Sequence, residues 1–387
     1  MRHLPAVVLG ALLLLATFPT GAATPPDHSR RLIDSVLARI PDPTALSWWY
    51  ARGVVFLGAD QVGQRVRDFS YVDYARRWAE SRVLPSGQIV DQHGAPIELW
   101  ALDHLMPGAL LARLLAVTGD ERYRLALQAM RAALDAWPRS ANGGFWHNTR
   151  SNGQLWADGA YMATSFLLAY GRTVDDGGAA RDEAVRQLLA YAEVLQDQRT
   201  GLMFHAWHEP RRAFWANRVT GRSPEFWCRA NGWYGMALVN VLEELPSFHP
   251  QRKRLLTILR RLAAGLARYQ DPKSQLWFQV MDKGAMRANW TETSCSAMHA
   301  LVLGRGAKRG WLEAGYIDKV RAARRAVEAR VKLQPDELVG LEGAAAGTSV
   351  GDLAYYLARP RPVNDWHGVG AFLLMEEELT RLGIRRP

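Results

Sequence analysis

Apolar side chains recur at every third or fourth position along most of this chain of 387 residues. Such spacing places them on one face of an α-helix. The clearest predicted helices lie over 120–136, 180–196, 250–269 and 313–332. Alternating runs of β-branched residues, which are typical of strands, are nearly absent. Strand-like pieces occur only in the connections, at 144–147, 202–205 and 276–280. The pattern predicts an all-α protein.

A tryptophan followed closely by a polar or charged residue opens several further helices. The clearest cases are Trp100 with Asp103, Trp156 with Asp158, Trp227 with Arg229, and Trp290 with Glu292. Trp49-Tyr50 and Trp366 extend the series at its two ends. Each interval between these positions is long enough to hold a second helix, so we expect six helical hairpins.

These hairpins are expected to close into a ring. A hairpin cannot bury its apolar face alone, so the units must pack side by side, and a ring buries both ends of the array. The chain is therefore expected to form an (α/α)6 toroid. The less charged first helix of each pair would be the inner one, and the inner N-termini would meet at one rim. The alternative is that the tryptophans only pack the core, as most buried tryptophans do.

The predicted rim collects side chains that suit a sugar. They are Asp103, His147, Asp158, His205, Arg229 and Glu292, beside the tryptophans. Aromatic faces cover the C–H surface of a sugar, polar groups fix its hydroxyls, and paired carboxylates cleave glycosides. A helix N-terminus lowers the pKa of Asp158, but a second carboxylate raises it. We therefore expect Asp103 to hold a proton on Asp158 near neutral pH.

Each of these side chains also has a structural alternative. Helix capping is the alternative for the acids Asp103, Asp158 and Glu292, and we leave Glu292 out of the catalytic set. A satisfied core position is the alternative for His147 and His205. Arg229 could pair with Glu225 or Glu292, although its planar fork favours a substrate carboxylate.

The charge balance favours an anionic partner. The formal net charge is +10, which attracts anionic substrates over long range. No stripe of interleaved basic and aromatic residues indicates a nucleic acid. No cluster of histidine, cysteine and carboxylate has metal-ligand spacing, and no glycine-rich loop could cradle a phosphate. We expect no metal, no cofactor, and a monomer or weak oligomer.

The N-terminus looks like a secretory signal peptide over 1–23. Basic residues precede an apolar run over 4–18, and a small-residue cleavage site ends at Ala23. The run is too short to span a bilayer, and no later segment is long and apolar enough. We expect a periplasmic or secreted protein with a single catalytic domain over 24–387.

The chain has two cysteines, Cys228 and Cys295. An exported protein could join them in a disulfide. A core of this size needs no such crosslink, however, so we expect two buried thiols.

Three blocks of sequence stand out at 155–162 (LWADGAYM), 201–207 (GLMFHAW) and 226–234 (FWCRANGWY). They resemble the signature blocks of glycoside hydrolase family 105, the unsaturated rhamnogalacturonyl hydrolases. Further matching blocks lie at 103–108, 143–147, 293–298 and 364–372. The family is an (α/α)6 toroid, in agreement with the repeat. The sequence departs from the family pattern at Asn148 and at Gly159-Ala160. These departures bear on which sugar the enzyme accepts next to the uronate.

The resemblance implies an unusual reaction on an anionic unsaturated oligosaccharide. The substrate would carry a 4,5-unsaturated uronic acid at its non-reducing end, and the enzyme would hydrate this vinyl ether. Asp158 would protonate the double bond, water would add at the adjacent carbon, and the hemiketal would collapse with loss of the glycosidic bond. Asp103 would be the second carboxylate. The resemblance places Tyr50, His147, Trp156, His205, Trp227, Arg229 and Trp233 around the pocket.

Two other functions remain open from the sequence. One is a related carbohydrate enzyme, either a hydrolase of unsaturated glycosaminoglycan fragments as in family 88 or a lyase on the same barrel. The other is a non-catalytic sugar-binding toroid that uses the same aromatic cup.

Overall fold

A computed structural model describes residues 27–174 and 178–385. The predicted signal peptide, 1–23, lies outside the described residues. None of the described helices is both long and apolar enough to cross a bilayer.

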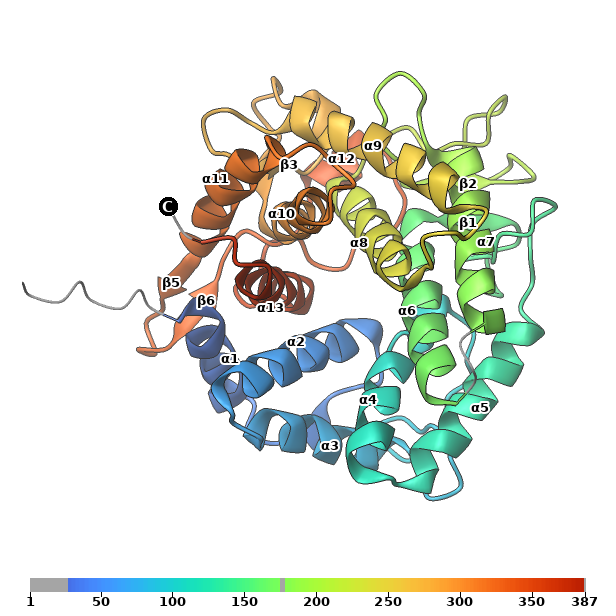
Figure 1. The fold of residues 1–387 in the computed structure, drawn as a ribbon, viewed down its shortest axis with the longest axis vertical. Coiled ribbons are helices and arrows are strands. Elements are labelled where there is room, and N and C mark those ends of the chain that lie inside the picture. The colour runs from blue at the N-terminus through green and yellow to red at the C-terminus, as the bar shows by residue number, and fades with distance from the viewer. Residues whose placement is uncertain (1–26, 175–177, 386–387) are drawn as a thin grey trace, which may run out of the picture.

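Six of the described helices form an inner ring (Figure 1). They are α2 (Tyr50–Val66), α4 (Gly108–Thr118), α6 (Ala157–Thr173), α8 (Cys228–Glu244), α10 (Thr293–Lys308) and α13 (Trp366–Arg381). The last of these, α13, packs against the first, α2, and this contact closes the circle. The predicted (α/α)6 toroid is confirmed.

Six further helices in the described part form the outer ring. They are α1 (His28–Arg39), α3 (Ser70–Arg82), α5 (Glu121–Asp135), α7 (Gly178–Leu195), α9 (Arg252–Tyr269) and α11 (Tyr316–Glu328). Four of them correspond to the helices expected from apolar spacing. Short helical pieces also occur in the connections, at η1 (Pro43–Ala45), η2 (Leu102–His104), η3 (Met281–Lys283) and α12 (Leu353–Leu357).

The two rings differ in how they are buried. Every residue of α8 from Cys228 to Val239 is buried, because this inner helix has neighbours on all sides. The outer helix α9 buries one stripe that includes Leu255, Leu259, Leu262 and Leu266, and its arginines face outward. This contrast explains why the less charged helix of each pair is the inner one.

The strands within the described residues form three antiparallel pairs. They are β1 (Gln154–Trp156) with β2 (Ala206–His208), β3 (Trp277–Phe278) with β4 (Thr291–Glu292), and β5 (Val331–Leu333) with β6 (Val339–Leu341). Each strand lies in a connection that leads from an outer helix to the next inner helix. The segment 276–280 contains β3 as expected, whereas 144–147 and 202–205 form only isolated bridges. These longer connections build the end of the toroid where the inner helices begin.

Candidate active site at the N-terminal rim

Asp158 lies in the first turn of α6, directly after strand β1. The strand ends at Trp156, which takes the N-cap position without a side-chain capping bond. Asp158 is buried, with 6 % of the residue exposed, and its Oδ2 atom has no hydrogen-bond partner among the described residues. Asp158 is therefore not a capping residue: its carboxylate is directed toward His205, whose Nε2 lies 3.4 Å from Oδ2.

Tyr356 of α12 fixes the ring of His205 from the other side. The Tyr356 hydroxyl lies 2.7 Å from His205 Nδ1, and the backbone N–H of Gly351 donates to the same hydroxyl. In the tautomer that carries its hydrogen on Nε2, Nδ1 of His205 accepts from the Tyr356 hydroxyl and the Nε2–H faces Asp158. Tyr356 lies outside the hairpin repeat and was not predicted from the sequence.

Asp103 lies in η2, just before inner helix α4. It makes no capping bond, and its Oδ2 lies 3.8 Å from Nε2 of His147. The His147 ring stacks flat on Trp156, with ring centroids 4.2 Å apart. Burial lowers the pKa of His147 to about 4, so the ring beside Asp103 is neutral.

The two carboxyl groups have pKa values shifted in opposite directions. Burial, together with the negative charge of Asp158, raises the pKa of Asp103 well above its ordinary value. Burial also acts to raise the pKa of Asp158, but interactions with His205, His147 and its own backbone N–H outweigh it, and the pKa is lowered. The expectation that Asp103 holds a proton on Asp158 is therefore wrong for the free site. The two directions favour the protonated form for Asp103, because His205 and His147 stabilise the charged form of Asp158.

The glycine after Asp158 allows this close assembly. A Cβ atom at Gly159 would lie 2.8 Å from the Tyr191 hydroxyl and 3.3 Å from Nδ1 of His147. The Tyr191 hydroxyl donates to the Phe145 carbonyl in the same connection. Helix α6 can approach His147 because residue 159 has no side chain.

Aromatic side chains surround the carboxyl groups. Trp227 lies beside His205, with ring centroids 4.4 Å apart. Trp156 is partly exposed and forms the aromatic wall of the candidate site. The Tyr50 ring lies edge-on to the Trp233 ring, with ring centroids 6.0 Å apart. Trp233 is fully buried, so it lies beneath Tyr50 and not on the surface of the cup.

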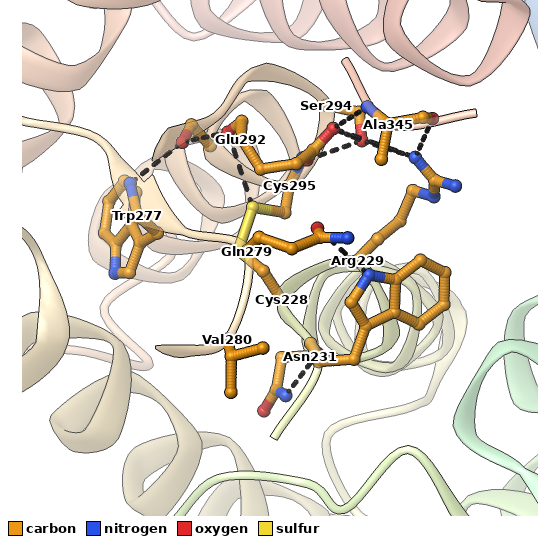
Figure 2. The surroundings of a disulfide bond; sticks show 12 residues. Cys228, Arg229, Asn231, Trp277, Gln279, Val280, Glu292, Ser294, Cys295 and Ala345 are labelled. Atoms are coloured by element: carbon orange, nitrogen blue, oxygen red, sulfur yellow. Dashed lines mark hydrogen bonds and ion pairs between the residues drawn. A yellow bond between two sulfur atoms is a disulfide. The ribbon is translucent and has the colours of Figure 1, made fainter. Parts of the chain in front are cut away.

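Arg229 is fully buried and bonded to protein groups (Figure 2). Its guanidinium donates to the carbonyls of Ala345 and Ala346, at 2.6 and 2.8 Å. It also lies 3.7 Å from Glu292, one of the two alternative partners considered for it. Glu292 caps α10 by accepting from the backbone N–H of Cys295 at 2.6 Å. The capping alternative for Glu292 is confirmed.

Cys228 and Cys295 form a disulfide (Figure 2). The prediction of two buried thiols is wrong. Each cysteine lies in the first turn of its inner helix, α8 or α10, and these helices are neighbours in the ring. Their Cα atoms are therefore only 5.6 Å apart, within the range that a disulfide spans. The crosslink joins the helix that carries Arg229 to the helix that Glu292 caps.

A histidine–aspartate pair adjoins the site and was also missed. His367 Nδ1 lies 2.6 Å from Oδ1 of Asp365, which caps inner helix α13. The His367 ring packs beside the Tyr50 ring, with ring centroids 5.3 Å apart. Both residues belong to the block 364–372, which matches the family 105 pattern in sequence.

Short contacts connect most of the nine predicted site residues. One chain of pairwise contacts runs from Asp103 through His147, Trp156 and His205 to Asp158. A branch of the same chain runs from His205 to Trp227 and then to Arg229. Tyr50 and Trp233 form a second group. Burial raises the pKa of Tyr50, and the negative charges of Asp103 and Asp158 act in the same direction. The structure therefore brings residues from the starts of four inner helices, α2, α4, α6 and α8, to one rim.

Comparison with known proteins identifies the family. The sequence model described as Glycosyl Hydrolase Family 88 matches residues 29–383. The structure of a family 105 glycoside hydrolase from C. acetobutylicum is similar, with a TM-score of 0.86 and 31% identity. The alignment covers 92% of this chain and all of that one. The chain belongs to glycoside hydrolase family 105.

Two curated proteins are also similar to this family 105 chain. Protein Atu3128 of Agrobacterium fabrum is 35% identical over 231 residues, which is 56% of this chain and 97% of the relative. The unsaturated rhamnogalacturonyl hydrolase YesR of Bacillus subtilis is 28% identical over 300 residues, 75% of this chain and 80% of YesR.

The toroid of this family 105 enzyme also has a cavity at the opposite end. It has a volume of about 660 Å³ and is lined mainly by residues from the middle and C-terminal parts of inner helices. Its charged groups pair with one another, as Arg113 does with Asp60 at 2.7 Å and Arg305 with Glu378 at 2.6 Å. Asp103 and Asp158 at the N-terminal rim, by contrast, have only histidines as ion-pair partners among the described residues. The N-terminal rim is therefore the candidate active site.

Proposed function

We propose that this glycoside hydrolase releases a 4,5-unsaturated uronic acid from the non-reducing end of pectin-derived rhamnogalacturonan oligosaccharides. The similarity to YesR, whose name states this type of activity, supports the substrate class. The observation that carries the proposal is the buried pair of Asp103 and Asp158, with pKa values shifted in opposite directions. Such a pair supplies an acid and a base at the same pH.

The proposed reaction begins with one proton shared by the two carboxyl groups. In the free site this proton is on Asp103. A uronate carboxylate that enters beside Asp158 adds negative charge and excludes water, and both effects favour the neutral form of Asp158. Asp158 then becomes the group able to donate, and Asp103 becomes the stored source of the proton.

Protonation and hydration follow at the double bond. Asp158 donates its proton to C4 of the unsaturated uronate, which leaves positive charge shared between C5 and the ring oxygen. The Asp158 carboxylate stabilises this cation and then takes a proton from the water that attacks C5. Asp158 is thereby reprotonated, and the hemiketal collapses with loss of the glycosidic bond.

The other predicted site residues position these groups. We assign sugar contact to Trp156, the partly exposed wall. His147, His205 and Trp227 hold the carboxyl groups and exclude water, and Trp233 supports Tyr50 from below. The charge of buried Arg229 attracts the substrate carboxylate, although its hydrogen bonds go to protein carbonyls.

We also propose that the enzyme acts outside the cytoplasm as a monomer or weak oligomer on an anionic oligosaccharide. The signal-like sequence of 1–23 and the net charge of +10 support this setting.

Loss of ultraviolet absorbance tests the proposed function, because hydration removes the conjugated double bond. A panel should contain unsaturated disaccharides from rhamnogalacturonan and from glycosaminoglycans. The proposal predicts loss of absorbance with the rhamnogalacturonan disaccharide and little with the others. A gain of absorbance on the saturated polymer would indicate a lyase, and tight binding without turnover would indicate a sugar-binding protein.

A further inference from the structure

The loop over 209–222 (EPRRAFWANRVTGR) lies next to the aromatic wall of the candidate active site. It follows strand β2, which pairs with the strand that ends at Trp156. Trp215 of the loop is nearly buried in a small apolar cluster with Val350, and Trp156 packs against that cluster. The loop therefore rests on the same tryptophan that stacks on His147.

Hydrogen bonds hold this loop in one shape. Nδ1 of His208 accepts from the backbone N–H groups of Arg212 and Ala213, at 3.1 and 2.6 Å, and its Nε2 lies 2.9 Å from the Asn152 carbonyl. Burial lowers the pKa of His208, which keeps the ring neutral and suited to accept at Nδ1. The side chain of Asn217 accepts two further backbone N–H groups within the loop. Its surface is thus preorganised for a ligand.

The outer surface of the loop is both apolar and cationic. Phe214 is 82 % exposed and Val219 is 76 % exposed, although both are large apolar residues. Three exposed arginines accompany them, Arg211, Arg212 and Arg218. Among the described residues no carboxylate forms an ion pair with any of the three, and Arg218 donates to the Arg211 carbonyl within the loop. Glu209 of the loop accepts from the backbone N–H of Ala141.

This combination matches the chemistry of a uronate sugar. An exposed aromatic ring can cover the C–H face of a pyranose, and guanidinium groups bind its carboxylate. A rhamnogalacturonan oligosaccharide carries a further galacturonate beyond the neutral sugar that follows the cleaved bond. We propose that the loop over 209–222 is a distal subsite that binds this second, anionic uronate.

The inference rests on the proposed function for its substrate and adds a preference for longer chains. It is tested by kinetics on the unsaturated rhamnogalacturonan disaccharide and tetrasaccharide at low ionic strength. The variants are Phe214→Ala and the double variant Arg212→Ala/Arg218→Ala. Matched controls are Phe248→Ala, an aromatic residue 88 % exposed in the α8–α9 connection, and Arg254→Ala on outer helix α9.

The wild type should have a lower KM for the tetrasaccharide than for the disaccharide. The loop variants should raise the ratio of tetrasaccharide KM to disaccharide KM about three- to tenfold, the range that exposed charge and stacking contacts produce. The two controls should leave the ratio unchanged, and added salt should reduce the wild-type preference. A wild-type ratio near one, or equal ratios in loop and control variants, would overturn the subsite.

Binding measurements separate this test from the proposed function. If the wild type consumed neither sugar, the proposed function would fail, and calorimetric titration of the tetrasaccharide would still decide the subsite. Weaker tetrasaccharide binding in Phe214→Ala than in Phe248→Ala supports the subsite. Equal binding in these two variants contradicts it.

Discussion

Nε2 of His205 lies 3.4 Å from Oδ2 of Asp158, and neither atom has a hydrogen-bond partner in the part of the chain that the structure describes. The Tyr356 hydroxyl holds the opposite ring nitrogen at 2.7 Å. A tyrosine from α12 thus directs an imidazole at the carboxylate proposed to donate the proton. Because the pKa of Asp158 is lowered, the proposed mechanism requires a proton stored on a neighbouring group.

Tyr356→Phe tests this positioning. The variant removes the hydroxyl that bonds His205 Nδ1 and leaves the ring free to adopt the other tautomer. Loss of one such buried hydrogen bond is worth roughly 1–2 kcal/mol, so kcat should fall about tenfold. KM should change little, since Tyr356 does not reach the cup surface. Equal kcat values for Tyr356→Phe and the wild type would contradict a positioning role.

Asp103→Asn should move the alkaline limb of the pH–rate profile to lower pH. In the wild type the pair keeps its proton until pH exceeds the raised pKa of Asp103. In the variant the proton must reside on Asp158, whose pKa is lowered. Activity at neutral pH should fall about tenfold for each pH unit by which the limb moves. Profiles of kcat/KM against pH for both proteins provide the measurement, and an unmoved limb would contradict proton storage on Asp103.

The same substitution should stabilise the fold as pH rises. Because the folded-state pKa of Asp103 lies above its ordinary value of 3.8, the folded protein binds more protons than the unfolded chain. Asp103 therefore contributes to the free energy of unfolding in full below its unfolded-state pKa, and this contribution is lost as pH rises toward its folded-state pKa. The amide in Asp103→Asn does not titrate and has no such loss, so the variant should gain about 1–3 kcal/mol relative to the wild type at pH 8. Urea unfolding at pH 8 and pH 3.5 checks this, with little difference expected at the lower pH.

Removal of the disulfide should destabilise the protein. Cys228 and Cys295 are 67 residues apart in sequence, and their link limits the freedom of the unfolded chain. The double variant Cys228→Ala/Cys295→Ala should lose about 2–4 kcal/mol of unfolding free energy. A reductant should lower the stability of the wild type and leave that of the variant unaffected. Equal stability of the two proteins without reductant would contradict the crosslink.

The sequence predicts the toroid because its signal is repeated. Apolar spacing in 120–136 or 250–269 is sufficient for a helix, and tryptophans opening successive helices indicate six equivalent units. The same repeat places Asp103, Asp158 and Arg229 at one rim, although they are far apart in the chain. Their grouping follows from topology alone, so it could be predicted.

The missed features depend on contacts between different connections. The pKa of Asp158 is lowered because His205 approaches it from another connection, and no local sequence pattern encodes that distance. Tyr356 lies in a helix outside the repeat. The disulfide, however, could have been predicted: both cysteines occupy first turns of neighbouring inner helices, a position that the repeat itself specifies.

The turnover of unsaturated rhamnogalacturonan disaccharide by Asp158→Asn tests the central claim most directly. The amide keeps the size of the side chain but cannot donate a proton to C4. Loss of ultraviolet absorbance should become undetectable, while the variant keeps its thermal unfolding transition and still binds the disaccharide. Turnover by Asp158→Asn at the wild-type rate would show that another group protonates the double bond, and the proposed mechanism would be wrong.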